Sequence, residues 1–151
     1  MKQWKVVDDV VMGGKSAGSF QLDPKGFGVF SGTISLENNG GFSSVRYDFP
    51  SKEIKNFTYI SLRVRGKPSR YQLRLKTNTE DRHAYIHYFE IDENWKTVLL
   101  KISDFYPTFR GKRLDMPNFS EATLEQVAFL LANKKQESFR LEIKNIHLGS
   151  Y

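Results

Sequence analysis

Short segments in which hydrophobic and polar residues alternate recur along the chain, separated by glycine, proline, asparagine or serine. In residues 58–65, Ile60, Leu62 and Val64 fall on one side of an extended backbone and polar residues on the other. A period of two residues is typical of a β-strand with one buried face. The pattern predicts strands in residues 27–36, 44–49, 58–65, 71–76, 84–91, 97–102, 127–131 and 139–148.

Helical signals are weak by comparison. Residues 120–125 predict at most one short helical turn, capped by their first serine, and residues 103–105 predict a second. Pro50 is expected to end the strand at 44–49, because proline cannot donate a hydrogen bond to a neighbouring strand. The sequence therefore predicts an all-β fold in a single domain over residues 1–151, with two packed sheets favoured over a closed barrel.

Several of these strands carry Arg or Lys on the side that faces away from the core, since successive side chains point to opposite faces. Strands close in sequence often pair, so the cations are expected to share one sheet face. Like charges on neighbouring strands repel unless they are spread apart, paired with carboxylates or facing an anionic ligand. Two interpretations stay open, a solvated outer face with carboxylates nearby and an anion-binding face. The cations concerned are Arg46, Arg63, Arg65, Arg74 and Lys76.

The overall charge and composition narrow the class of protein. Lys and Arg number 23 against 17 Asp and Glu, a formal net charge of +6, but the longest basic run is only Lys134–Lys135. Such a spread charge favours acidic partners without indicating nucleic acid, so no nucleic-acid partner is expected. No stretch reaches the roughly 18 apolar residues of a membrane-spanning helix. With no cysteine and no visible signal or transit peptide, we expect a cytoplasmic protein without a transmembrane segment.

Metal ligands are sparse. His83 and His87 would reach one metal ion only on a helix, whereas in a strand their Cα atoms are separated by roughly 13 Å. Asp8 and Asp9 could offer oxygens to a hard cation, but capping of turn amides is the favoured interpretation. We therefore expect neither a metal site nor a cofactor.

Two short motifs imitate catalytic or nucleotide-binding loops. Residues 14–18 spell Gly-x-Ser-x-Gly, and residues 13–16 resemble part of a phosphate-binding loop. Both motifs need a following helix, but residues 19–24 look like a strand closed by a turn. We therefore assign no catalytic residue and expect no enzyme activity. Glycoside hydrolysis by a pair of carboxylates is the least favoured alternative.

Exposed aromatic rings are a further means of recognition, because they stack on sugars and anchor protein partners. Residues 105–111 are rich in such groups and look like a loop. A contact surface and a hydrophobic lid over the end of the sandwich explain this segment equally well. The aromatic candidates are Trp4, Tyr59, Tyr88, Trp95, Tyr106 and Phe109.

Two Gly-Gly blocks identify a family more clearly than they identify a chemistry. They are residues 9–16 (DVVMGGKS) and residues 38–46 (NNGGFSSVR). With them the chain resembles the complex I intermediate-associated protein 30 family over nearly its whole length. The resemblance continues through Phe30–Gly32, Leu62–Gly66, Tyr71, Trp95, Phe105, Arg110–Gly111 and Phe139–Ile146.

This resemblance implies a galactose-binding-domain-like jelly-roll β-sandwich with a non-enzymatic role. Eukaryotic members of the family act in mitochondria as chaperone-like assembly factors for respiratory complex I. Residues 65–70 depart from the family pattern, because they lack the acidic residue expected just after the glycine. The two Gly-Gly blocks are expected to be neighbours, each with at least one glycine at positive φ.

Two functions follow as hypotheses. The first is a binding protein that assists assembly of a protein complex, with a protein client as partner. The alternative is a module that binds a sugar or an anionic small molecule on a basic and aromatic sheet face. The candidate binding residues are Asp9, Met12, Gly13, Gly14, Ser16, Asn38, Asn39, Arg46, Arg63, Arg74, Lys76, Trp95, Phe109 and Arg110.

Overall fold

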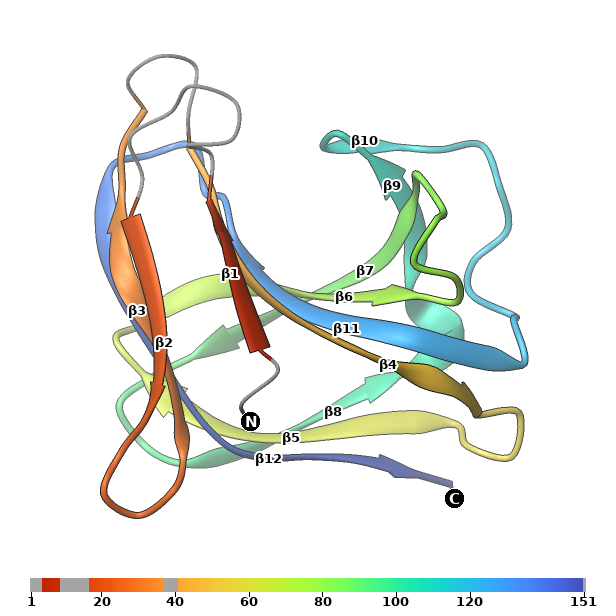
Figure 1. Cartoon of the computed structure of the whole chain (residues 1–151), viewed down its shortest axis with the longest axis horizontal. Coiled ribbons are helices and arrows are strands. Elements are labelled where there is room, and N and C mark those ends of the chain that lie inside the picture. Colours follow the sequence, from red (N-terminus) through yellow and green to blue (C-terminus); the bar gives the residue numbers. More distant parts are fainter. Residues whose placement is uncertain (1–3, 9–16, 37–40, 151) are drawn as a thin grey trace.

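The computed structural model describes residues 4–8, 17–36 and 41–150. They form two antiparallel sheets that pack as a sandwich (Figure 1). The elements are β1 (Trp4–Asp8), β2 (Ala17–Leu22), β3 (Gly28–Ile34), β4 (Ser43–Glu53), β5 (Tyr59–Gly66), β6 (Ser69–Lys76), β7 (Ala84–Ile91), β8 (Lys96–Lys101), the 3₁₀ turn η3 (Ile102–Asp104), β9 (Tyr106–Phe109), β10 (Lys112–Arg113), β11 (Thr123–Leu131) and β12 (Glu137–Gly149).

The seven-stranded sheet has the order β1-β4-β11-β6-β7-β9-β10, and the five-stranded sheet has the order β2-β3-β12-β5-β8. Consecutive strands therefore often lie in different sheets, as β5 and β6 do. Strand β11, late in the chain, lies between β4 and β6 and pairs with both. The predicted all-β sandwich is confirmed, and this strand order decides which side chains meet on each sheet face.

The core lies between the two sheets and is filled by the apolar positions of the alternating strands. Leu62 and Val64 of β5 and Leu73 and Leu75 of β6 are fully buried. Burial of such side chains is the main favourable contribution to folding. Trp4 of β1 packs against the same core through stacked contacts with Phe20, Tyr47 and Phe129.

One predicted strand end is wrong. Strand β4 does not stop before Pro50 but continues through it to Glu53. Between the pairs Leu124–Lys52 and Gln126–Asp48, the register of β4 against β11 shifts, so Pro50 lies in an irregular part of the ladder. On its other side, among the described residues, β4 pairs with β1 only up to Tyr47. An irregular part of the ladder tolerates proline, because no regular hydrogen bond to β11 requires its missing N–H.

Two further local predictions differ from the structure. Residues 120–125 form no helical turn, because the Ile54 N–H donates to the Ala122 carbonyl and Thr123 already pairs with Glu53 in the sheet. Residues 105–111 are not simply a loop, since Phe105 is fully buried and β9 follows it. The predicted turn at residues 103–105 is present as η3, one residue earlier.

Candidate functional site

The outer face of the seven-stranded sheet carries a continuous row of side chains across six strands. Residues paired across neighbouring strands lie on the same face. The pairings Lys5–Arg46, Arg46–Ala128 and Ala128–Arg74 join β1, β4, β11 and β6. The row continues through Arg74–Ile86 and Ile86–Tyr106 into β7 and β9. Arg46 and Arg74 therefore flank the small side chain of Ala128.

The next row along the same strands contains a further cation, Lys76. Gln126 pairs with Lys76 on one side and with Asp48 on the other. Its Nε2 donates a hydrogen bond of 2.7 Å to Asp48 Oδ1, and Lys76 Nζ donates one of 2.7 Å to the Asp81 carbonyl. The cations of this outer surface are Lys5, Arg46, Arg70, Arg74, Lys76 and Arg113, and we call it the basic face.

Arg46, Arg74 and Lys76 have no carboxylate partner in the part of the chain that the structure describes, since no Asp or Glu oxygen lies within 4.0 Å of their charged nitrogens. Arg74 Nη1 instead donates to Gln72 Oε1 at 3.0 Å. The Arg46 Nε is buried and has no hydrogen-bond partner among the described residues. Such an arrangement of like charges favours an anionic ligand.

The pKa values of Arg74 and Lys76 are both shifted by their surroundings. Burial lowers the pKa of the Arg74 guanidinium. Burial also lowers the pKa of the Lys76 amine, and the positive charges of Arg74 and Arg46 lower it further, against the smaller opposing effects of Asp81 and Asp48. Each shift means that the environment disfavours the charged form. A bound anion would offset that cost.

Two tyrosines extend the basic face toward β9. Tyr88 accepts a hydrogen bond of 3.4 Å from Gln72 Nε2, and the Arg70 guanidinium lies 4.1 Å from the Tyr88 ring centroid. The guanidinium of Arg113 lies 4.5 Å from the ring centroid of Tyr106. A cation over each ring is a favourable cation–π arrangement. Each tyrosine ring on this face is therefore accompanied by a positively charged guanidinium group.

A polar hollow of about 570 Å³ adjoins one end of the basic face. Arg70 and Glu90, which are paired across β6 and β7, line it together with Asn133 and Lys135. The Asn133 Nδ2 donates to the Arg70 carbonyl at 3.1 Å and so ties the turn after β11 to β6. The hollow therefore adds Lys135 beside Arg70, at this end of the basic face.

The five cations predicted to share one face separate into two groups, so that prediction is wrong for Arg63 and Arg65. Both lie on β5 in the five-stranded sheet. Arg63 Nη1 donates to Thr97 Oγ1 at 3.2 Å, and Arg65 Nη2 lies 3.3 Å from Glu142 Oε1. The solvated interpretation, with a carboxylate nearby, fits Arg65.

Three described candidates remain, Trp95, Phe109 and Arg110, and they lie away from Arg46, Arg74 and Lys76. Trp95 is in the β7–β8 connection, where it packs edge-on against Phe27 at 5.5 Å under the guanidinium of Arg65. Phe109 follows the outward Thr108 on β9 and so points to the opposite side of the strand. Arg110, with φ of 51°, lies in the following turn with its guanidinium 5.3 Å from the Phe109 ring.

The candidates Asp9, Met12, Gly13, Gly14, Ser16, Asn38 and Asn39 lie outside the described residues. Next to these segments, the end of β1 is paired with the start of β4, through Asp8 and Ser43. The described glycine of the second block, Gly41, has a φ of 141°, as predicted for that block.

Sequence reasoning missed several residues of the basic face. Arg70 and Gln72 alternate with Tyr71 and Leu73 on β6, so the same period of two that selected Arg74 could have selected them. An alanine has no functional group that would suggest a binding site. Ala128 belongs to the basic face only because β11 lies between β4 and β6.

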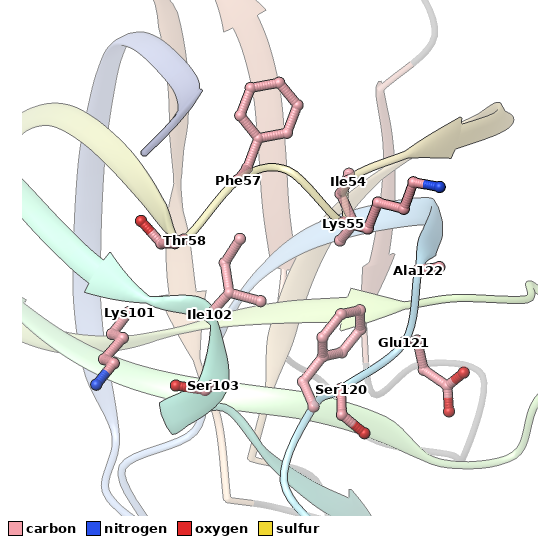
Figure 2. Close-up of a pocket in the computed structure, with 11 residues that line it drawn as sticks. Ile54, Lys55, Phe57, Thr58, Lys101, Ile102, Ser103, Ser120, Glu121 and Ala122 are labelled. Carbon is pink, nitrogen blue, oxygen red and sulfur yellow. The ribbon is translucent and has the colours of Figure 1, made fainter. Parts of the chain in front are cut away.

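A second hollow, of about 280 Å³, lies elsewhere, between the β4–β5 loop, η3 and the segment before β11 (Figure 2). Its lining includes Ile54, Phe57, Ile102 and Phe119, and none of the candidate binding residues. In residues 4–8, 17–36 and 41–150, no three His, Cys, Asp or Glu side chains form a group that could hold a metal ion. Those residues also contain no helix long and apolar enough to cross a membrane.

The family model of complex I intermediate-associated protein 30 matches residues 1–143. The chain belongs to this family. The resemblance based on the Gly-Gly blocks is thereby confirmed. None of the curated proteins compared with the chain matches it.

The fold is also shared with solved structures of low sequence identity. The family 11 carbohydrate-binding module of the cellulosomal cellulase Lic26A-Cel5E of Clostridium thermocellum is 19% identical, with a TM-score of 0.71 over 99% of this chain and 88% of that chain. A family 11 module from Clostridium thermocellum in complex with a β-1,3-1,4-mixed-linked tetrasaccharide is 18% identical, with a TM-score of 0.70 over 99% of this chain and 90% of that chain. The agarase AgWH50C is 7% identical, with a TM-score of 0.68 over 100% of this chain and 23% of that chain. The jelly-roll sandwich is therefore the fold of this family member.

Proposed function

We propose that this protein is a non-catalytic binding module that holds an acidic segment of a client protein on the basic face. The observation that carries the proposal is the convergence of Arg46, Arg74 and Lys76 on one sheet face with no carboxylate within 4.0 Å among the described residues. A client with acidic side chains would supply the missing counter-charges.

The family supports a protein as the partner. Its name associates its members with an intermediate of complex I, and we propose a related assembly role for this chain. A chaperone-like assembly factor needs a surface that recognises its client reversibly. Electrostatic complementarity serves this purpose, because it accelerates association and gives specificity without requiring a large apolar interface.

Carbohydrate binding is the second candidate, favoured by the jelly-roll neighbours and by Tyr88 and Tyr106 on the basic face. Neutral sugars bind such faces mainly by stacking on aromatic rings. Here a guanidinium already lies over each ring, Arg70 over Tyr88 and Arg113 over Tyr106. The face is therefore better suited to an acidic partner than to a neutral sugar.

The proposal is tested by affinity capture from the native cells with matched variants. Arg74→Met removes one charge from the basic face but keeps a long side chain, and Arg63→Met removes one charge from the other sheet. We expect a client that wild type and Arg63→Met retain, that Arg74→Met loses, and that elutes when salt is raised from about 0.05 M to about 0.5 M. A client retained equally by Arg74→Met would overturn the proposal. Binding of a mixed-linked tetrasaccharide by the purified protein, lost in Tyr88→Ala, would support the second candidate instead.

A further inference from the structure

The outer surface of β11 bears an unusually small residue between two guanidinium groups. Ala128 pairs with Arg46 on one side and with Arg74 on the other, so the two arginines occupy the same row. Neighbouring strands are about 4.8 Å apart, which places the two arginine backbones roughly 10 Å from each other. That spacing allows two long side chains to approach one group between them.

The alanine is what makes this approach possible. Its side chain ends at Cβ, and neighbouring groups cover it, since Ala128 is only 5% exposed. A larger side chain at this position would meet the flanking Arg46 and Arg74 side chains and hold their guanidinium groups apart. Ala128 therefore lies beneath the site, with Arg46 on one side and Arg74 on the other.

Some hydrogen-bond donors of Arg46 and Arg74 have no partner among the residues that the structure describes. A guanidinium has five N–H donors. Arg74 uses one of them on Gln72 Oε1 at 3.0 Å, and the buried Nε of Arg46 has no partner among the described residues. A buried donor without an acceptor is unfavourable.

The carboxylate nearest in the register does not fill the site. Asp48 lies one row away and accepts the 2.7 Å hydrogen bond from Gln126. It forms no ion pair with Arg46 or Arg74 in the described part of the chain. No carboxylate of the described residues therefore neutralises the two guanidinium groups, and an anion from outside the protein would do so.

We propose that Arg46 and Arg74 form, above Ala128, a binding site for one carboxylate group of an acidic segment of the client protein. The planar fork of a guanidinium matches the two oxygens of a carboxylate and binds them through paired hydrogen bonds. Lys76, in the adjacent row, adds positive charge beside the site. This inference rests on the proposed function and names the group by which the client is anchored.

The test uses the full chain, a fluorescent glutamate-rich peptide, and binding measured by fluorescence anisotropy at low salt. Ala128→Leu fills the site without changing the charge of the protein. Loss of a charge-assisted hydrogen bond is expected to weaken peptide binding about tenfold. Arg63→Met, on the other sheet, should leave binding within about twofold, since distant surface charges are screened. The same peptide with glutamine in place of glutamate should not bind.

A second variant tests the same site in case Ala128→Leu does not fold. Arg46→Lys/Arg74→Lys keeps both charges but removes both guanidinium forks, and should also weaken binding about tenfold. Peptide binding unchanged in whichever of these variants folds would overturn the carboxylate site, while client capture that still depends on Arg74 would leave the proposed function intact. Failure of wild type to bind the glutamate-rich peptide would also overturn the site. An oligogalacturonate carries its carboxylates on a sugar chain. If it bound more tightly than the peptide, the proposal that the carboxylate belongs to a protein would be overturned.

Discussion

Gly66 at the end of β5 lies directly against the carbonyl group of Arg140 in β12, so that a Cβ added to Gly66 would overlap the Arg140 oxygen. The contact joins two strands that pair in the five-stranded sheet. Gly66→Ala should therefore destabilise the protein by about 2–3 kcal/mol, because backbone must move to admit the methyl group. Urea denaturation measures this change in the free energy of unfolding.

Gly26→Ala is the matched control for that substitution. Gly26 has a φ of 85°, but a Cβ there would meet no atom within 4 Å. It should cost about 1 kcal/mol, which reflects backbone strain alone. An equal cost at both glycines would contradict the close approach of Gly66 to Arg140.

Leu141 of β12 is fully buried between the two sheets. Leu141→Ala should lower the free energy of unfolding by about 2–5 kcal/mol, because it removes buried methyl groups and leaves a cavity. Leu99→Ala is a suitable control, since Leu99 is 57% exposed on β8. That substitution should change stability by no more than about 0.5 kcal/mol.

Alkaline pH should destabilise the fold through Tyr71. Burial raises the pKa of the Tyr71 hydroxyl, and the negative charge of Glu137 raises it further. Above about pH 10 the unfolded chain loses this proton while the folded chain retains it. The folded state then binds more protons than the unfolded state, so stability falls as pH rises.

Tyr71→Phe removes the ionisable hydroxyl from this balance. Denaturation at a series of alkaline pH values should show a smaller loss of stability in Tyr71→Phe than in wild type. The same dependence in both proteins would show that the ionisation of Tyr71 does not contribute to the alkaline destabilisation.

Asp48→Asn should strengthen binding of an acidic partner. The asparagine oxygen can still accept the hydrogen bond from Gln126, while one negative charge leaves the basic face. Because the repelling charge is exposed and screened, affinity should rise only roughly two- to fivefold. Anisotropy titration of the glutamate-rich peptide measures the change, and weaker binding would argue against an acidic partner.

Much of the fold was predictable from local pattern. Alternation along residues 58–65 and 71–76 placed Leu62 and Leu73 in the core and Arg63 and Arg74 on outer faces, as the structure shows. This succeeds because the two-residue period of a strand couples each side chain to the burial of its neighbours. The local pattern failed at Pro50, which lies within β4. The irregular pairing of β4 with β11 tolerates a proline there, and such pairing cannot be read from the residues of one strand.

The candidate site was predictable only in part. Arg46, Arg74 and Lys76 were identified as outward cations, but Arg63 was grouped with them because nearby strands were expected to pair. Strands β5 and β6 instead lie in different sheets. Three of the five predicted cations therefore gather on the basic face, and Arg63 and Arg65 do not.

The sequence by itself determined the β-rich fold class, the family, and the side of its strand on which each cation lies. Only the tertiary structure decided that β11 lies between β4 and β6 and so places Ala128 between Arg46 and Arg74. The physical reason is that alternation depends on adjacent residues, whereas strand order depends on packing between segments far apart in the chain.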